Sequence, residues 1–316
     1  MTAPAIGAVV IGRNEGERLI RCLRSLQGQV QQLVYVDSGS TDGSAEAART
    51  LGARVVELDL SQPFTAARAR NAGLAALGDG FEYVQFVDGD CEADPGWIAA
   101  AAAFLQSRPE VAVACGRRRE RFPEASVYNR LCDAEWNTPI GEAKACGGDA
   151  LMRVEMVRAA GGYRDSLIAG EEPELCLRLR RAGWQVWRLE AEMTLHDAQM
   201  QHFGQWWQRS RRAGHAFAEG AALHGKGPER HWAAETRRAL IWGAALPAAI
   251  VVAGMIHPYL LLAALIYPAQ VLRLSRRMGY EQALFTVLGK FAEAAGALEF
   301  FWNRWRGKAR GILEYK

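Results

Sequence analysis

The chain contains 316 residues, enough for one large domain or two of modest size. Half of its residues are hydrophobic and 23% are charged, a balance that excludes disordered, collagen-like and coiled-coil chains. The net charge of +3 excludes the broad basic field of a nucleic-acid-binding protein, so we expect no nucleic-acid partner.

Apolar runs alternate with amphipathic stretches along the first third of the chain. Strands are predicted at 5–11, 33–36, 54–58 and 83–87, and helices at 19–26, 44–51 and 66–77. This alternation predicts an α/β fold with a mostly parallel central sheet and helices on both faces. Ligands of such sheets bind at the carboxyl ends of the strands, where Arg13, Asp37 and Asp88 begin polar loops.

The middle of the chain is less regular. A helix is predicted near 96–106 and a strand at 111–115, followed by irregular sequence to about residue 146. The glycine-rich sequence of Gly147, Gly148 and Asp149 is then expected to open another helical segment.

Two uncharged, mostly apolar runs lie near the C-terminus, at 240–256 and 259–272. The first has 17 residues, the lower limit for crossing a hydrocarbon core about 30 Å thick. Arginines flank the pair on both sides, which favours a hydrophobic hairpin with both ends on the cytoplasmic side. A buried helical subdomain is the alternative interpretation.

An amphipathic helix is predicted over 281–305, where apolar residues recur at steps of three and four. From Arg273 to Lys316 there are nine basic and four acidic residues, and aromatic residues accompany them. This combination predicts contact with an anionic membrane surface, with a solvated charged helix as the alternative. We place a catalytic domain over 1–230 and a helical membrane-associated region over 231–316.

The cysteines and the N-terminus bear on location. The six cysteines are scattered without a C-x-x-C pair, as expected for thiols in a core. The opening MTAPAIGAVVIGRNE has no basic region before its short apolar run, which predicts a first strand and no signal peptide. We therefore expect a cytosolic body at the cytoplasmic face of the inner membrane.

Asp88-Gly89-Asp90 ends the apolar run YVQFVDGD. Two carboxylates separated by one residue at a sheet edge can hold Mg²⁺ or Mn²⁺, which in turn can bridge to a diphosphate. An isolated D-x-D is a weak signal, because a turn alone explains it equally well. Its position after a predicted strand favours the metal interpretation.

Three further segments carry candidate side chains. Asp37 could accept a hydrogen bond from a nucleoside, and Arg70 in ARARNAG could reach a phosphate. Glu171 and Glu172 begin a predicted helix, where acidic residues complement the dipole but could also act as a general base. His196 could be a third metal ligand, although a lone histidine is more often structural.

The ordered set of motifs resembles a family 2 glycosyltransferase of the GT-A fold, an inverting enzyme, over roughly residues 5 to 200. The motifs are VVIGRNE, VYVDSGSTDGS, ARARNAG, FVDGD, GGDALMR, GEEPELCLRLRRAG and LHD. The resemblance implies binding of the nucleotide by Arg13, Asn14, Glu15, Asp37, Arg70, Asn71 and Asp88. It implies metal binding by Asp90, Asp88 and His196, and acceptor binding by Trp136, Gly148 and Asp149.

The resemblance also assigns the base. The acidic pair of the family usually ends in aspartate, and its second position here is Glu172, which we expect to be the general base, with Glu171 as the alternative. The loop GRNE replaces the family's commoner Pro-x-Asn-Glu sequence. Processive members carry Q-x-x-R-W, which this chain replaces by QWWQRSRR, and this difference implies that one sugar is added per cycle.

These features predict transfer of a sugar from a nucleotide-diphosphate sugar, with a UDP-sugar favoured, to a lipid-linked saccharide or glycolipid acceptor. Mg²⁺ or Mn²⁺ is the implied cofactor. A nucleotidyltransferase and a membrane-tethered sugar-nucleotide-binding scaffold are the alternatives. The absence of G-x-G-x-x-G after the first predicted strand disfavours a dinucleotide oxidoreductase.

Overall fold

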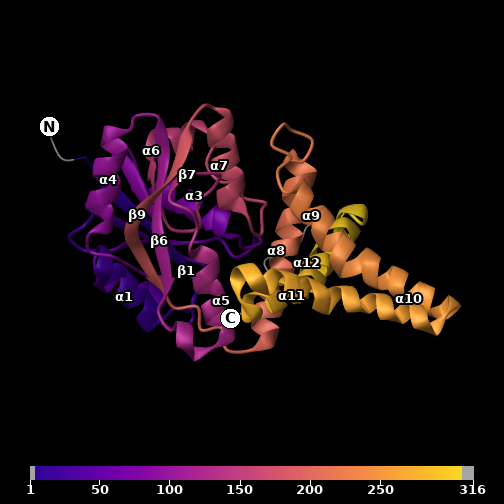
Figure 1. Ribbon diagram of the computed structural model, residues 1–316. Helices are drawn as coiled ribbons and strands as arrows, with labels where there is room; N and C mark the ends of the chain where they lie inside the picture. The colour runs from indigo at the N-terminus through magenta and orange to yellow at the C-terminus, as the bar shows by residue number, and fades with distance from the viewer. Residues whose placement is uncertain (1–3, 308–316) are drawn as a thin grey trace. The chain divides into compact units, whose positions relative to one another are not determined.

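The computed structural model describes residues 4–307 (Figure 1). The chain forms two compact units that divide between Gln199 and Met200, which is earlier than the boundary at 230 placed from the sequence. Residues 1–3 and the last basic residues of the predicted anionic-surface contact, Lys308, Arg310 and Lys316, lie outside the described part.

Within residues 4–307, the first unit contains a nine-stranded sheet in the order β3-β2-β1-β4-β8-β6-β9-β5, with β7 beside β9. The strands are β1 (Ile6–Gly12), β2 (Gln32–Asp37), β3 (Arg54–Glu57), β4 (Tyr83–Asp88), β5 (Cys91–Ala93), β6 (Val111–Glu120), β7 (Gly141–Ala143), β8 (Ala150–Arg153) and β9 (Gln185–His196). The helices are α1 (Glu17–Leu26), α2 (Ser44–Thr50), α3 (Ala66–Leu77), α4 (Trp97–Ser107), the short 3₁₀ turn η1 (Pro123–Ala125), α5 (Val127–Trp136), α6 (Val154–Ala159) and α7 (Glu171–Arg181).

The sheet combines parallel and antiparallel pairs. Strands β3, β2, β1 and β4 are parallel, as predicted, and β6 also runs parallel to β9. Strand β8 is antiparallel to both β4 and β6 and joins the two parallel parts. The expected α/β class is thus confirmed, with antiparallel pairing confined to the second half of the sheet and to its short strands.

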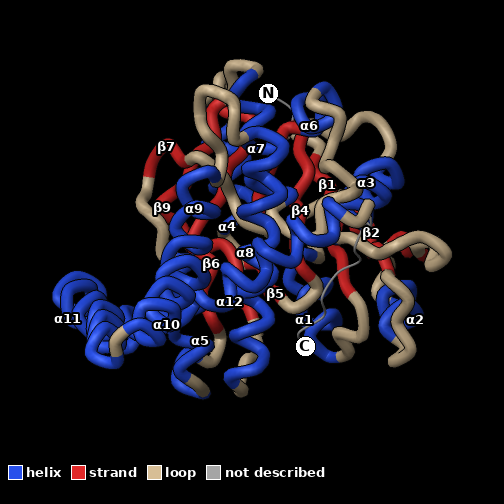
Figure 2. Tube along the Cα trace, turned by 90° about the vertical axis from the view of Figure 1, so that its right-hand side faces the viewer, coloured by secondary structure: helices blue, strands red, loops and turns tan. Residues whose placement is uncertain are grey.

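Helices cover both faces of the sheet (Figure 2). In β1, Val9 belongs to a core with α3, α4 and α7, whereas Val10 belongs to a second core with α1 and α2. Successive side chains of a strand point to opposite faces, so a strand covered on both sides is apolar throughout. All six cysteines are buried free thiols, as the sequence predicted.

Two expectations for the middle of the chain are wrong. The strand predicted at 111–115 continues to Glu120, and the segment called irregular contains α5. Gly148 and Asp149 lead into strand β8, and helix α6 follows only after it. The reason is that residues 150–152 are buried between β4 and β6, where a strand satisfies the backbone hydrogen bonds.

The second unit is helical over the residues that the structure describes. Its elements are α8 (Phe203–His224), α9 (Ala233–Leu240), the π-helical turn η2 (Ile241–Ala245), α10 (Leu246–Ile256), the 3₁₀ segment η3 (Pro258–Leu265), α11 (Ile266–Met278) and α12 (Tyr280–Trp305). The continuous helical stretches Ala233–Ile256 and Pro258–Met278 have 24 and 21 residues and mean hydropathies of 2.2 and 1.2. Both are long and apolar enough to cross a membrane, and little of their apolar surface is buried.

Helix α12 has two different faces. Its buried face consists mainly of small residues, such as Ala283 and Gly296, where a Cβ at Gly296 would lie 1.9 Å from the carbonyl oxygen of Arg211 in α8. Small residues allow helices to approach this closely. The predicted stripe of larger residues, including Leu284 and Trp302, is only half-buried or exposed within this unit.

Candidate active site

The carboxyl ends of three strands lie at one edge of the sheet in the first unit. Gly12 at the end of β1 pairs with Asp37 at the end of β2. On the other side of β1, Ile11 pairs with Asp88 at the end of β4. The polar loops that follow these strands therefore meet at this edge, where ligands of such sheets bind.

The first two loops are tied together by side-chain hydrogen bonds. The backbone N–H of Thr41 donates to Asn14 Oδ1 at 2.7 Å, and the backbone N–H of Asn14 donates to Ser40 Oγ at 2.9 Å. Asn14 adopts a positive φ of 53°, a conformation that asparagine tolerates better than most residues. These contacts give the loop after β1 a defined shape beside the loop after β2.

The carboxylate of Asp37 is buried and well coordinated. Its Oδ1 accepts a hydrogen bond from the hydroxyl of Tyr35 at 2.9 Å, and its Oδ2 accepts from the backbone N–H groups of Gly39 and Ser40. Asp37 thus organises the turn after β2. Glu15, also predicted for the nucleotide site, is buried nearby and forms a 2.6 Å ion pair with Arg18.

The buried guanidinium of Arg70 joins three carboxylates. From α3, Nη2 donates to Asp88 Oδ1 at 2.9 Å, and Nη1 donates to Glu171 Oε1 at 2.7 Å. Glu172 Oε1 lies 3.0 Å from the same Nη1. Burial alone would raise the pKa of Asp88, but the guanidinium groups of Arg70 and Arg118 outweigh it and lower that pKa below its ordinary value.

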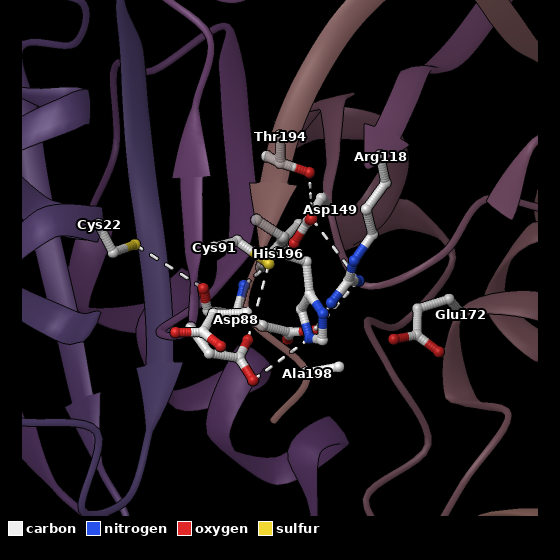
Figure 3. Close-up of polar contacts among 12 residues, drawn as sticks. Cys22, Asp88, Cys91, Arg118, Asp149, Glu172, Thr194, His196 and Ala198 are labelled. Atoms are coloured by element: carbon white, nitrogen blue, oxygen red, sulfur yellow. Dashed lines mark hydrogen bonds and ion pairs between the residues drawn. The ribbon is translucent and has the colours of Figure 1, made fainter. Parts of the chain in front are cut away.

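Glu172 lies in the first turn of α7 and is drawn apart from the cluster around Asp88 in Figure 3. Burial raises its pKa to about 7, and the negative charge of Glu171 adds to the effect while Arg70 opposes it. A carboxyl with a pKa near neutrality is suited to accept a proton during a reaction. The geometry therefore supports the predicted base without excluding its neighbour Glu171.

Arg118 of β6 also contacts this group of carboxylates. Its guanidinium lies 3.4 Å from Asp88 Oδ2 and 3.6 Å from Asp149 Oδ2 (Figure 3). It also lies 4.8 Å from the ring centroid of Trp136. Asp149 is fixed in turn, because it accepts hydrogen bonds from the backbone N–H of Asp88 and from the hydroxyl of Thr194. The predicted acceptor residues Trp136 and Asp149 are thus brought together with Asp88.

A candidate metal site lies near Arg118. His196 Nε2 is 3.3 Å from Asp90 Oδ2, and both side chains are buried. One ligand atom from each of these residues and from Cys91 all lie within 4.8 Å of one another. The carboxylate and imidazole fit a divalent cation such as Mn²⁺ or Mg²⁺. Asp88, also predicted as a ligand, directs its carboxylate to the two arginines in this structure.

Glu120 contacts the ring nitrogen of His196 that faces away from Asp90. Its Oε2 lies 3.3 Å from His196 Nδ1 and accepts from the backbone N–H of Ala198 at 3.1 Å. Its Oε1 accepts from the side-chain amide of Asn129 and from the backbone N–H of Phe122. Such a carboxylate fixes the orientation of a metal-binding imidazole and its tautomer.

Gly148 leaves room for the central ion pair. A Cβ at this position would lie 2.6 Å from Asp88 Oδ2 and 2.7 Å from Arg70 Nη2. Because real Cβ atoms do not approach other atoms so closely, any larger residue would displace the pair. Gly148 thus contributes to the site because its lack of a side chain leaves space for the Asp88–Arg70 ion pair.

The remaining residues predicted to bind the nucleotide are Asn71 in α3 and Arg13 in the loop after β1. The side-chain amide of Asn71 donates to the carbonyl oxygen of Tyr163 and to Asp165 Oδ1, and its oxygen accepts from the backbone N–H of Tyr163. Asn71 therefore anchors the loop after α6. Arg13 is exposed in the loop after β1.

Sequence reasoning missed Arg118, Glu120 and Thr194. The first two follow an apolar strand within the charged run RRRE, which appeared to end the strand. Their spacing of two residues places both on the same face of β6. This strand-like alternation could have indicated that the strand continues through the charged run.

Comparisons with known proteins agree with this geometry. Residues 8–168 match the sequence profile described as Glycosyl transferase family 2. Succinoglycan biosynthesis protein ExoA of Rhizobium meliloti (strain 1021) is 31% identical over 184 residues, which cover 54% of this chain and 56% of that protein. Glycosyltransferase AglE of Haloferax volcanii is 23% identical over 198 residues, 58% of this chain and 64% of that protein. The match thus spans little more than half the length of these curated relatives.

Solved structures share the fold. The mannosyltransferase PcManGT from Pyrobaculum calidifontis, solved in complex with GDP-Man and Mn²⁺, has a TM-score of 0.68 at 22% identity and covers 96% of this chain and 88% of its own. S. aureus TarS 1-349 has a TM-score of 0.54 at 15% identity and covers 96% of this chain and 92% of its own.

Proposed function

Because the chain belongs to glycosyl transferase family 2, we propose that it transfers one sugar from a nucleotide-diphosphate sugar to an acceptor hydroxyl. The observation that carries this proposal is Arg70, which joins Asp88 of the predicted donor site to the acidic pair of α7. The mannosyltransferase with GDP-Man and Mn²⁺ supports a nucleotide-sugar donor and a divalent cation. A UDP-sugar is the donor that we would try first.

On the donor side, the loops after β1 and β2 bind the nucleoside, with Asp37 beneath it. Asp90 and His196 would hold Mg²⁺ or Mn²⁺. Asp88 would join them as a ligand once the donor has replaced it as the partner of Arg70 and Arg118. A cation bound there neutralises negative charge on the diphosphate. Arg70 and Arg118 supply further positive charge close to Asp88.

On the acceptor side, Glu172 acts as the base. It takes the proton of the acceptor hydroxyl while the hydroxyl oxygen forms a bond to the anomeric carbon of the sugar. The bond from that carbon to the diphosphate oxygen breaks, and the nucleoside diphosphate leaves with the electron pair. Attack from the face opposite the leaving group inverts the anomeric configuration. Trp136 and Asp149, which both contact Arg118, are assigned to the acceptor side.

We further propose that the acceptor is a lipid-linked saccharide or a glycolipid at the cytoplasmic face of the membrane. Two apolar helical stretches, Ala233–Ile256 and Pro258–Met278, support this assignment because they are long enough to span a bilayer. The name of the relative from Rhizobium meliloti, a succinoglycan biosynthesis protein, supports a role in polysaccharide assembly.

The test is a panel of UDP-, GDP- and TDP-sugars with the detergent-solubilised chain and Mn²⁺ or Mg²⁺, followed by release of the nucleoside diphosphate. We expect release from one donor that EDTA prevents and that Asp90→Ala removes. Release of pyrophosphate from a sugar phosphate and a nucleoside triphosphate would instead indicate a nucleotidyltransferase. Calorimetric binding of a donor without turnover, even with lipid-linked acceptors added, would contradict the transferase and support a scaffold.

A further inference from the structure

Helices α11 and α12 enclose an apolar groove in the second unit. Its volume is about 470 Å³, within the range of about 300–1,000 Å³ that is typical of ligand sites. The lining residues are Tyr267, Pro268, Val271, Leu272, Tyr280, Leu284, Val287, Leu288 and Phe291. The hydroxyl of Tyr267, one of the lining residues, donates to the carbonyl oxygen of Trp242.

The groove has an inner and an outer end. At the inner end, the rings of Tyr267 and Phe291 pack with their centroids 5.3 Å apart. Toward the outer end, Leu272 is 62% exposed and Tyr280 is 63% exposed. Large apolar residues at the open end of an apolar groove indicate that a hydrocarbon ligand covers them, because water is an unfavourable neighbour for this surface.

Positive charge lies at the outer end. Arg276 follows Leu272 by four residues in α11, so the two occupy the same face of the helix. Arg273 and Arg277 are exposed on the neighbouring faces. Among residues 4–307, no carboxylate forms an ion pair with any of these three arginines. The groove therefore combines an apolar channel with three exposed arginines near its mouth.

We propose that this groove binds one hydrocarbon chain of an anionic phospholipid, whose phosphate group is bound by Arg276. The charge of Arg273 and Arg277 adds to the attraction. A soluble anion would leave the apolar channel empty, and a neutral lipid would leave the arginines unpaired, so charge complementarity selects an acidic bilayer lipid. The proposal rests on the membrane association included in the proposed function and adds a specific lipid site to it.

The test uses the full chain in vesicles of phosphatidylcholine alone and of an equal mixture with phosphatidylglycerol. A trace of either lipid carries a photoreactive diazirine on its acyl chain, and labelled peptides are identified by mass spectrometry. We expect labelling of the segment 267–291 to be about fivefold stronger with the phosphatidylglycerol probe, the preference expected for one arginine at an anionic group.

Two variants with matched controls separate the apolar and the charged part. Leu284→Trp fills the groove and should abolish labelling there, whereas Leu298→Trp, an exposed position of the same helix, should leave it unchanged. Arg276→Gln should retain labelling but lose the preference for phosphatidylglycerol. Arg304→Gln, at the other end of α12, should keep that preference. Circular dichroism verifies that each variant is folded.

The outcomes are distinguishable. A chain that floats with neither type of vesicle would overturn the membrane part of the proposed function and this site with it. A chain that floats but is labelled equally by both probes, or labelled outside 267–291, would overturn the lipid site alone. Displacement of the probe by a polyprenyl phosphate at concentrations where phosphatidylglycerol does not displace it would replace the phospholipid by an acceptor-type lipid as the occupant.

Discussion

Replacing Glu172 by glutamine is expected to remove activity and, at high pH, to stabilise the protein. Burial raises the pKa of this carboxyl from an ordinary 4.5 to about 7. Each pKa unit corresponds to about 1.4 kcal/mol, so the ionised form of Glu172 destabilises the fold by at most about 3.5 kcal/mol. The glutamine carries no charge at any pH, but it also loses the ion pair with Arg70 at 3.0 Å.

The sign follows from the direction of the shift. Because the pKa is higher in the folded than in the unfolded state, the stabilising contribution is fully present below about 4.5 and is lost as the pH rises through about 7. Wild type should therefore lose stability relative to Glu172→Gln between these values. Denaturant unfolding of both proteins at about pH 5 and about pH 8 measures the difference.

The same variant tests the chemistry. If Glu172 takes the proton, the wild-type kcat/KM should rise about tenfold per pH unit below 7 and level off above it. Glu172→Gln should lose roughly 10²–10⁴-fold in rate while still binding the nucleotide donor. Glu171→Gln tests the alternative base: it should keep more activity than Glu172→Gln, and it should move the rise of kcat/KM to lower pH because the charge of Glu171 raises the pKa of Glu172. An equal stability gap at both pH values, together with a near-normal rate, would refute the reasoning.

Three further predictions concern the site and its surroundings. Glu120→Ala should weaken Mn²⁺ binding about 10–100-fold by calorimetry, because His196 loses its orienting partner, with rescue by Glu120→Gln; unchanged affinity would argue against this role. Gly148→Ala should displace the Arg70–Asp88 pair and abolish donor binding while the melting temperature falls by only a few degrees, and tight donor binding would contradict it. Ending the chain before Arg237 should release it from vesicles in flotation, and persistent flotation would place the anchor elsewhere.

The first half of the fold was predictable because its strands are apolar throughout. The run ending at Asp37 and the run ending at Asp88 are each followed by polar loops, and parallel pairing with β1 brings their ends together. The proximity of Asp88 to Arg70 was not evident from sequence, since it depends on how α3 lies against the sheet. The structure brings these residues together, while their roles with the donor stay predictions.

The second half was less predictable because charged residues occupy strand positions. In β6, the charged residues Arg118 and Glu120 follow the apolar residues of the core part of the strand, so the sequence suggested that the strand had ended. Their partners in the site are distant in sequence: Arg118 contacts Asp149, which Thr194 holds, and Glu120 contacts His196. Likewise, the apolar stripe of α12 was predicted, whereas the small residues that its helix neighbours require were not.

The pairing of Arg70 with three carboxylates bears on the proposed mechanism, because it connects the proposed donor side to the proposed base. A single guanidinium cannot keep Asp88, Glu171 and Glu172 at hydrogen-bonding distance and also turn toward an incoming diphosphate. Any donor that draws Arg70 away removes the cation that opposes the rise in the pKa of Glu172. With the roles proposed above, donor binding and protonation of Glu172 are therefore linked: a donor that draws Arg70 away raises the proton affinity of this carboxyl, and a protonated Glu172 in turn leaves Arg70 freer to meet the donor.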